Sequence, residues 1–265
     1  TYYEDPYDDY SYDDYGYEDS YDYDYSDDDT SYDTVDGSAE EGETENDSED
    51  GDAEKAEKPK KPARSAADGW PQAPELISES VLMLEADTGV TMYEKDVNTR
   101  RYPASTTKIM TGLLALEKCS LTEKITFSKT AVDLEEGASN IGAVEGEVMT
   151  MKDVLYGLML PSGNECANAI AEHIAGSVSA FADMMNERAA ELGCTDTHFT
   201  NPHGLFDRDH YTTAHDMGLI ALEAFNNSAF REIISKSEYT IPPTNMNEES
   251  RTLKTTHSMK LPDSE

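Results

Sequence analysis

The first fifty residues constrain this chain more than any other feature, because they contain almost nothing that could form a hydrophobic core. They carry 22 Asp and Glu side chains and no Lys or Arg, hold 11 of the 16 tyrosines, and lack Leu, Ile, Phe and Met. Dense like charge without aliphatic side chains leaves too little apolar surface to offset the conformational entropy lost on ordering. We therefore predict that residues 1–50 are a disordered acidic tail.

A Lys- and Pro-rich segment, residues 51–68, follows the tail, and its prolines make it locally extended. We interpret it as a linker. From residue 69 the composition becomes that of a globular domain, and residues 69–265 are numerous enough to bury a sizeable core. The sequence thus predicts a tail, a linker and one folded domain.

The overall charge excludes a large class of functions. The chain has 56 Asp and Glu against 20 Lys and Arg, a net charge of −36. Nucleic-acid binding requires clusters of Lys and Arg that neutralise phosphates, so no nucleic-acid partner is expected. Since no apolar stretch approaches the length of a membrane span, we expect membrane association only through segments absent from this chain.

The spacing of apolar residues in the folded domain predicts strands first and then a series of helices. Residues 80–85 and 90–93 flank the turn Asp87-Thr88-Gly89 and predict a β-hairpin. The segment 109–116 is apolar over a wide arc of a helix, which indicates a helix buried on most sides. Further helices are predicted at 151–160, 164–174, 179–192, 213–225 and 228–234, and a strand at 239–241.

The buried helix is preceded by Ser105-Thr106-Thr107-Lys108, the only Ser-x-x-Lys in the chain. Residues three apart share one face of a helix, so the Lys108 amine can reach the Ser105 hydroxyl. A serine needs an adjacent base to become a nucleophile, and burial lowers the pKa of a lysine toward the neutral form that can serve as that base. The alternative is a capping cluster at a helix start with a solvated lysine.

A second motif, Ser162-Gly163-Asn164, lies between two predicted helices and is the only Ser-x-Asn in the chain. A hydroxyl and a carboxamide on such a loop can project into a cleft, where the hydroxyl passes a proton and the amide holds a substrate carbonyl or the lysine. The competing interpretation is structural, because Ser162 and Glu165 have the spacing of a capping box.

Taken together, the two motifs resemble those of a known enzyme family. Residues 102–111, Tyr-Pro-Ala-Ser-Thr-Thr-Lys-Ile-Met-Thr, resemble the active-site segment of the serine-type D-Ala-D-Ala carboxypeptidases, the low-molecular-weight penicillin-binding proteins of peptidase family S11. Further family-like segments follow in the family's order: Gly146-Glu147, Leu160-Pro161-Ser162-Gly163-Asn164, Met185-Asn186, Leu192-Gly193, 199–205 and 210–216. The resemblance is dense from residue 76 to residue 216 and looser beyond.

The resemblance implies an α+β fold of the penicillin-binding and serine β-lactamase-like type, with an antiparallel sheet packed against a helical region. It implies a carboxypeptidase that removes the terminal D-alanine from the stem pentapeptide of peptidoglycan and is acylated by β-lactam antibiotics. Ser105 would be the acylated nucleophile and Lys108 its general base, while Ser162 would assist proton transfer and Asn164 would bind substrate. No cofactor and no metal is implied, and the family commonly acts outside the cytoplasmic membrane, in the cell envelope.

The sequence departs from the family in one respect, since it contains no Lys-Thr-Gly, the family's third motif. Residues 252–260 resemble the segment just before that motif, so we expect the fold to be incomplete on its C-terminal side. A serine β-lactamase shares the Ser/Lys chemistry, but its usual Glu-x-x-x-Asn beyond the Ser-x-Asn loop is not found there: Glu165, Glu172, Glu187 and Glu191 are each followed four positions later by a residue other than Asn. A non-catalytic cell-wall-binding scaffold is the other alternative, suggested by the missing motif and the acidic tail.

The cysteines and histidines were weighed as metal ligands. Cys119, Cys166 and Cys194 have the spacing of neither a disulfide framework nor a metal site, and we interpret them as small buried apolar side chains. A group of histidines and aspartates offers a metal-site hypothesis: His203, Asp207, Asp209, His210, His215 and Asp216. They match no compact ligand signature such as His-Glu-x-x-His, so we expect structural roles for them.

Overall fold

The computed structural model describes residues 76–257; the predicted tail (1–50) and linker (51–68) lie outside the described residues. In chain order the elements are β1 (Val81–Leu84), β2 (Thr91–Lys95), the 3-10 helix η1 (Ala104–Thr107), α1 (Lys108–Lys118), β3 (Lys124–Thr126), α2 (Lys129–Val132), β4 (Val148–Thr150), α3 (Met151–Met159), α4 (Asn164–Ala175), α5 (Val178–Glu191), α6 (Ala214–Asn226), α7 (Ser228–Ser235), β5 (Glu238–Ile241) and β6 (Arg251–Lys254). The mixture of helices and strands confirms the predicted α+β class.

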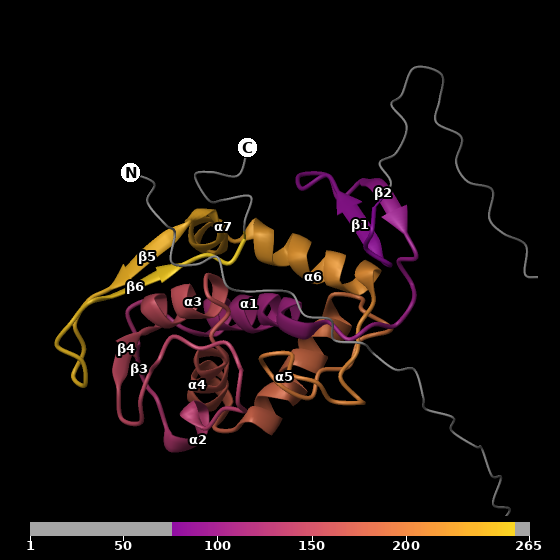
Figure 1. Cartoon of the computed structure of the whole chain (residues 1–265). Coiled ribbons are helices and arrows are strands. Elements are labelled where there is room, and N and C mark those ends of the chain that lie inside the picture. Colours follow the sequence, from indigo (N-terminus) through magenta and orange to yellow (C-terminus); the bar gives the residue numbers. More distant parts are fainter. Residues whose placement is uncertain (1–75, 258–265) are drawn as a thin grey trace, which may run out of the picture. The chain divides into compact units, whose positions relative to one another are not determined.

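The strands of the described residues pair as three separate two-stranded antiparallel sheets, β1–β2, β3–β4 and β5–β6. The hairpin predicted around Asp87-Thr88-Gly89 is confirmed, with Val81 opposite Lys95 and Gly89 at a φ of +69° in the turn. The three sheets lie around a group of helices (Figure 1). The helices, therefore, supply most of the core.

Helix α1 lies at the centre of this group and packs against α3, α4, α5, α6 and α7. Every residue from Met110 to Ala115 is buried, Thr111 and Gly112 included, which is more than one and a half helical turns. This confirms the prediction from the wide apolar arc of 109–116. A helix enclosed by neighbours on nearly every side is a rigid support, and the Ser-x-x-Lys motif spans η1 and the first residue of this helix.

Helix boundaries follow local chemistry that the sequence contains. Helix α3 begins with a capping box, in which Thr150 and Asp153 each accept a hydrogen bond from the other's backbone N–H. Helix α5 ends before Gly193, whose φ of +84° is the left-handed conformation expected of a helix stop. The short elements β3, α2, β4 and β6 were not predicted, because three or four residues carry no readable periodicity.

Within residues 76–257, every helix is too short or too polar to cross a lipid bilayer.

Candidate active site

Ser105 lies in η1, which continues directly into α1. Ala104 starts η1 with a φ of +48°, a left-handed conformation that residues with a Cβ rarely adopt. A loop distant in sequence crosses at this point: a Cβ added to Gly204 would lie 1.8 Å from the carbonyl oxygen of Ala104. Only glycine fits so close an approach, and the crossing brings residues 201–205 against the helix that holds Ser105.

The amine of Lys108 is the centre of the site. The residue is only 2% exposed, and its Nζ lies 3.1 Å from Oγ of Ser105, 2.7 Å from Oδ1 of Asn164 and 2.9 Å from the carbonyl oxygen of His203. All three partners are uncharged. Burial consequently dominates and lowers the pKa of Lys108 to about 8, although Cys166 and Glu165 act in the opposite direction.

The same three contacts fit a neutral amine. The amide oxygen of Asn164 and the carbonyl oxygen of His203 can only accept hydrogen bonds, so Nζ donates to both. The Ser105 hydroxyl can donate as well as accept. A neutral amine has two N–H groups and one lone pair; with both N–H groups satisfied, the lone pair remains for the hydroxyl proton of Ser105. The geometry therefore suits proton transfer from Ser105 to Lys108.

Asn164 is buried at the first position of α4, with its amide directed to Lys108. The N-cap of this helix is Gly163, which has no side chain to cap with. Glu165 does not bond back to Ser162; its Oε1 accepts the backbone N–H of Ile141 at 2.6 Å. The capping-box interpretation of Ser162 and Glu165 is therefore wrong, and the loop residues are not used to start the helix.

Ser162 adopts a φ of +65°, and its Oγ is buried without a hydrogen-bond partner among the described residues. It lines a cavity of about 530 Å³ whose wall also includes Ser105 and Lys108. The structure thus joins Ser105, Lys108 and Asn164 in one hydrogen-bonded group and puts Ser162 on the same cavity. A strained backbone at a functional loop is a common way to aim a side chain.

The loop at 201–205 is the part of the site that sequence reasoning did not assign. Oγ1 of Thr111 donates to the carbonyl of Pro202 at 2.6 Å, and Asn201 Oδ1 accepts the N–H of Gly204 at 2.7 Å. These bonds hold the carbonyl of His203 over Lys108. The available signal was the family-like segment 199–205, but the functional atom in it belongs to the backbone.

Two histidines proposed above as metal ligands hold backbone segments in place. Nδ1 of His210 accepts the N–H of Thr200 at 3.0 Å, so its Nε2 carries the proton and donates to Oγ1 of Thr107 at 2.9 Å. Nδ1 of His203 accepts the N–H of Leu205 at 3.1 Å. Burial lowers the pKa of both rings to about 4, so both are neutral at physiological pH.

Cys166 is fully buried beneath the Ser-x-Asn loop, and burial raises its thiol pKa well above the usual value. Its Sγ would lie 2.6 Å from a Cβ added to Gly157 and 3.1 Å from one added to Gly163. Cys166 and Cys194 are buried as predicted. The prediction does not hold for Cys119, which is partly exposed.

The segment after β6 closes one side of the cavity. Thr255, Thr256 and His257 line it, and the N–H of Thr256 donates to the carbonyl of Leu160 at 3.2 Å. Sequence reasoning recognised 252–260 as family-like but gave these residues no contact with the site. Their position depends on how the β5–β6 hairpin is attached to the helical group.

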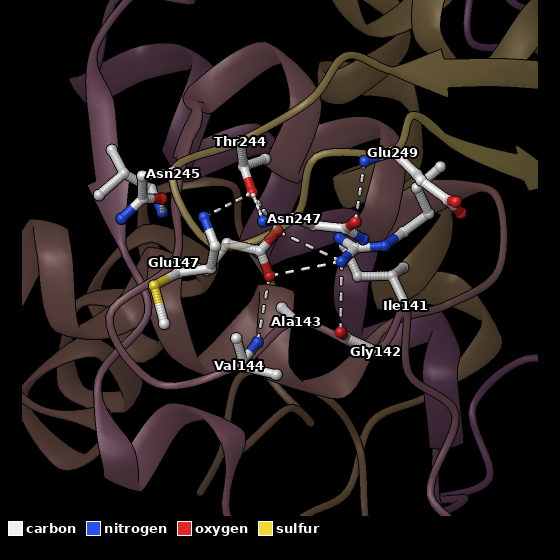
Figure 2. Close-up of polar contacts among 12 residues, drawn as sticks. Ile141, Gly142, Ala143, Val144, Glu147, Thr244, Asn245, Asn247 and Glu249 are labelled. Atoms are coloured by element: carbon white, nitrogen blue, oxygen red, sulfur yellow. Dashed lines mark hydrogen bonds and ion pairs between the residues drawn. The ribbon is translucent and has the colours of Figure 1, made fainter.

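That attachment is an ion pair between Glu147, which is fully buried, and Arg251 at the start of β6, whose side chain is 17% exposed. Nη2 of Arg251 lies 3.2 Å from Oε1 and 3.4 Å from Oε2 of Glu147. Figure 2 shows that Thr244 and Val144 also approach the carboxylate, the hydroxyl of Thr244 at 2.8 Å and the N–H of Val144 at 3.1 Å. The β5–β6 connection is thereby fastened to the residues that precede β4.

Comparison with known proteins finds relatives of this chain in the family that the motifs resemble. Residues 68–260 match the family model of peptidase S11, described as D-alanyl-D-alanine carboxypeptidase. The D-alanyl-D-alanine carboxypeptidase DacF of Bacillus subtilis is 42% identical over 151 residues, which cover 55% of this chain and 38% of the relative. The D-alanyl-D-alanine carboxypeptidase of Streptomyces sp. K15 is 37% identical over 163 residues, covering 58% and 56%. The chain thus spans less than two thirds of the length of either relative.

Solved structures agree with the predicted fold. The crystal structure of the Streptomyces K15 DD-transpeptidase superposes with a TM-score of 0.67 at 33% identity, covering 73% of this chain and 79% of that chain. The D-alanyl-D-alanine carboxypeptidase of Mycobacterium tuberculosis gives a TM-score of 0.66 at 27% identity, covering 73% and 72%. These matches confirm the penicillin-binding fold expected from the motifs.

Proposed function

The chain belongs to the S11 family of D-alanyl-D-alanine carboxypeptidases, and we propose that the protein acts as a serine carboxypeptidase on peptidoglycan. Its substrate is a stem pentapeptide, from which it removes the terminal D-alanine. Ser105 is the nucleophile, Lys108 the general base, Ser162 a proton-transfer group and Asn164 a substrate-binding and lysine-positioning group.

The observation that carries this proposal is the environment of Nζ of Lys108. It lies within hydrogen-bond distance of the Ser105 hydroxyl, is buried, and has only uncharged partners. With a pKa of about 8, roughly a tenth of the molecules hold a neutral Lys108 at pH 7. A structural lysine has no need of such a site, whereas a general base requires a pKa near the working pH.

The acylation step follows from these positions. The lone pair of Lys108 takes the hydroxyl proton as Oγ of Ser105 attacks the carbonyl carbon of the penultimate D-alanine. The negative charge that develops on the carbonyl oxygen faces the backbone N–H of Ser105 at the start of η1, where the helix dipole favours it. The C–N bond then breaks, the proton passes from Lys108 to the departing nitrogen, and D-alanine leaves.

Ser162 fits the proton-transfer step. Ser162 lines the same cavity as Ser105 and Lys108, and its Oγ has no hydrogen-bond partner among the described residues. A hydroxyl can accept the proton from Lys108 and donate its own to the leaving nitrogen, with no net change. Deacylation reverses these roles: water loses a proton to Lys108 as its oxygen attacks the ester carbonyl, the bond to Oγ of Ser105 breaks, and Lys108 returns the proton to Oγ as the peptide carboxylate leaves.

The proposal extends to inhibitors and to location. A β-lactam presents a strained amide to Ser105, and its ring nitrogen stays attached after the C–N bond breaks, so it acts as a covalent inhibitor. Because peptidoglycan lies outside the cytoplasmic membrane, we expect the protein to work in the cell envelope.

The test is labelling of the full-length protein with a fluorescent penicillin, together with D-alanine release from a pentapeptide. Ser105→Ala should abolish both, and Ser120→Ala, which removes a serine beyond the opposite end of α1, should abolish neither. Undiminished labelling of Ser105→Ala would overturn the mechanism. Rapid loss of the label with release of hydrolysed penicillin would instead indicate a β-lactamase, and stable folding without any labelling would indicate a non-catalytic scaffold.

A further inference from the structure

The far ends of the two site helices meet at a second cluster of reactive side chains. Helix α1 carries Lys108 in its first turn, and Cys119 follows its last residue. Helix α4 carries Asn164 in its first turn and His173 in its last. Glu123, just before β3, lies next to both ends. None of these three outer residues takes part in the mechanism proposed above.

The ligand atoms of Cys119, Glu123 and His173 all lie within 4.8 Å of one another. Nε2 of His173 is 3.2 Å from Oε2 of Glu123, and the Cys119 sulfur lies within 4.8 Å of both ligand atoms. The His173 and Glu123 side chains are 31% and 42% exposed, so the cluster is open to solutes. Cys119 and Glu123 lie in the connection between α1 and β3, whereas His173 lies in α4, and the spacing of the three residues matches no metal motif.

We propose that Cys119, Glu123 and His173 form a binding site for a thiophilic divalent cation, with Zn²⁺ as the best match. Thiolate sulfur, imidazole nitrogen and carboxylate oxygen are the ligands zinc prefers. Two ligands at about 2.0 Å from zinc lie roughly 3.3 Å apart across a tetrahedral angle, close to the observed Glu123–His173 separation. Three protein ligands leave the fourth position to water.

The surroundings of Glu123 favour this arrangement. Its Oε1 accepts the backbone N–H of Ser120 at 2.5 Å, which fixes the carboxylate and turns Oε2 toward His173. Such a hydrogen bond behind the coordinating atom is a usual feature of metal sites. On binding, the Cys119 thiol releases its proton to water as the sulfur–zinc bond forms, and His173 binds as neutral imidazole.

An ion at this position would join the outer ends of α1 and α4. These helices also pack against each other along their lengths, and their inner ends hold Lys108 and Asn164. The ion would therefore stiffen the frame of the site without touching the reacting atoms. This inference does not depend on the proposed carboxypeptidase activity.

The test is titration of the reduced, chelator-treated full-length protein with Co²⁺. This ion binds at zinc sites, and a thiolate ligand then gives a sulfur-to-cobalt charge-transfer band in the near ultraviolet. We expect this band at one ion per chain, displacement by Zn²⁺, and a rise in melting temperature of about 5 °C or more when Zn²⁺ exceeds its Kd a hundredfold. Cys119→Ser should lose the band, and His173→Gln should weaken Co²⁺ binding by about tenfold or more.

Cys194→Ala is the matched control, because it removes a buried thiol far from His173 in sequence and should keep the band. The acidic tail contains neither Cys nor His, so ions held there give no thiolate band. Co²⁺ binding without the band, or a band that survives in Cys119→Ser, would overturn the proposal. His173 is on the surface, so its variant remains informative if Cys119→Ser folds poorly.

Discussion

Two cationic side chains, the buried Lys108 and the partly buried Arg251, have opposite surroundings. Lys108 has three uncharged oxygen partners, and burial lowers its pKa to about 8. Arg251 faces the fully buried carboxylate of Glu147, whose oxygens also accept hydrogen bonds from the Thr244 hydroxyl and the Val144 N–H. The first cation can lose its proton, whereas a guanidinium is not deprotonated in proteins.

The difference in surroundings matches a difference in role, because the proposed base must change its protonation state and the ion pair must not. A base must alternate between two protonation states, and a carboxylate beside it would hold it in the charged one. The Glu147–Arg251 ion pair, the clamp that attaches the β5–β6 hairpin to the helical group, gains nothing from a change of protonation state. It needs a cation that stays charged. Even so, Nη1 of Arg251 has no partner among the described residues, so the clamp is not fully satisfied.

Removing the Lys108 amine should give the largest effect. Lys108→Ala is expected to slow penicillin acylation on the order of 10³-fold or more, because residues that act as a unit each cost about as much as the set. Stopped-flow labelling measures the rate, and Lys118→Ala, at the exposed end of the same helix, is the control. An acylation rate within tenfold of the wild type would mean that another group is the base.

Removing the Arg251 guanidinium should instead cost stability. Arg251→Met leaves the Glu147 carboxylate buried and uncompensated, which is expected to lower the free energy of unfolding by about 3–5 kcal/mol. Adding Glu147→Gln should recover part of the loss. Urea unfolding measures the stability of the single and the double variant, with Arg208→Met at an exposed position as the reference. If Arg251→Met is as stable as this reference, the ion pair does not hold the hairpin to the helical group.

Asn164→Asp would place a carboxylate beside Lys108, as Glu147 lies beside Arg251. A carboxylate 2.7 Å from Nζ should raise the pKa of Lys108 by about 1–3 units, and acylation at pH 7 should fall on the order of 10²-fold. The rate should recover as the pH rises. The control is Asn140→Asp on the exposed loop, and a rate deficit that is independent of pH would show that Asn164 acts on the substrate alone.

The smallest effect is expected from pH alone. Since the pKa of Lys108 is lowered to about 8, the neutral fraction grows as the pH rises through that value. The acylation rate of the wild type should increase about tenfold from pH 7 to pH 9 and then level off. The measurement is the second-order acylation rate constant, corrected for alkaline hydrolysis of the penicillin. A flat profile would contradict a titrating lysine base.

The sequence predicted those parts of the site whose residues are neighbours in the chain. Ser105 and Lys108 are three apart in one helical segment, so local geometry alone makes them meet. The β1–β2 hairpin and the long helices were predicted for the same reason, since turn chemistry and periodicity are local. The capping-box alternative for Ser162 and Glu165 was wrong because the Glu165 carboxylate bonds to Ile141, a contact that spacing cannot reveal.

The tertiary structure alone decided the remaining contacts. It brought the carbonyl of His203 to Lys108, paired Glu147 with Arg251, and gathered Cys119, Glu123 and His173. A carbonyl oxygen is present in every residue, and ion pairs between distant segments have no spacing to recognise. The sequence was therefore enough to propose Ser105 as the nucleophile and Lys108 as its base, whereas the surroundings that give Lys108 its lowered pKa exist only once distant segments have packed around it.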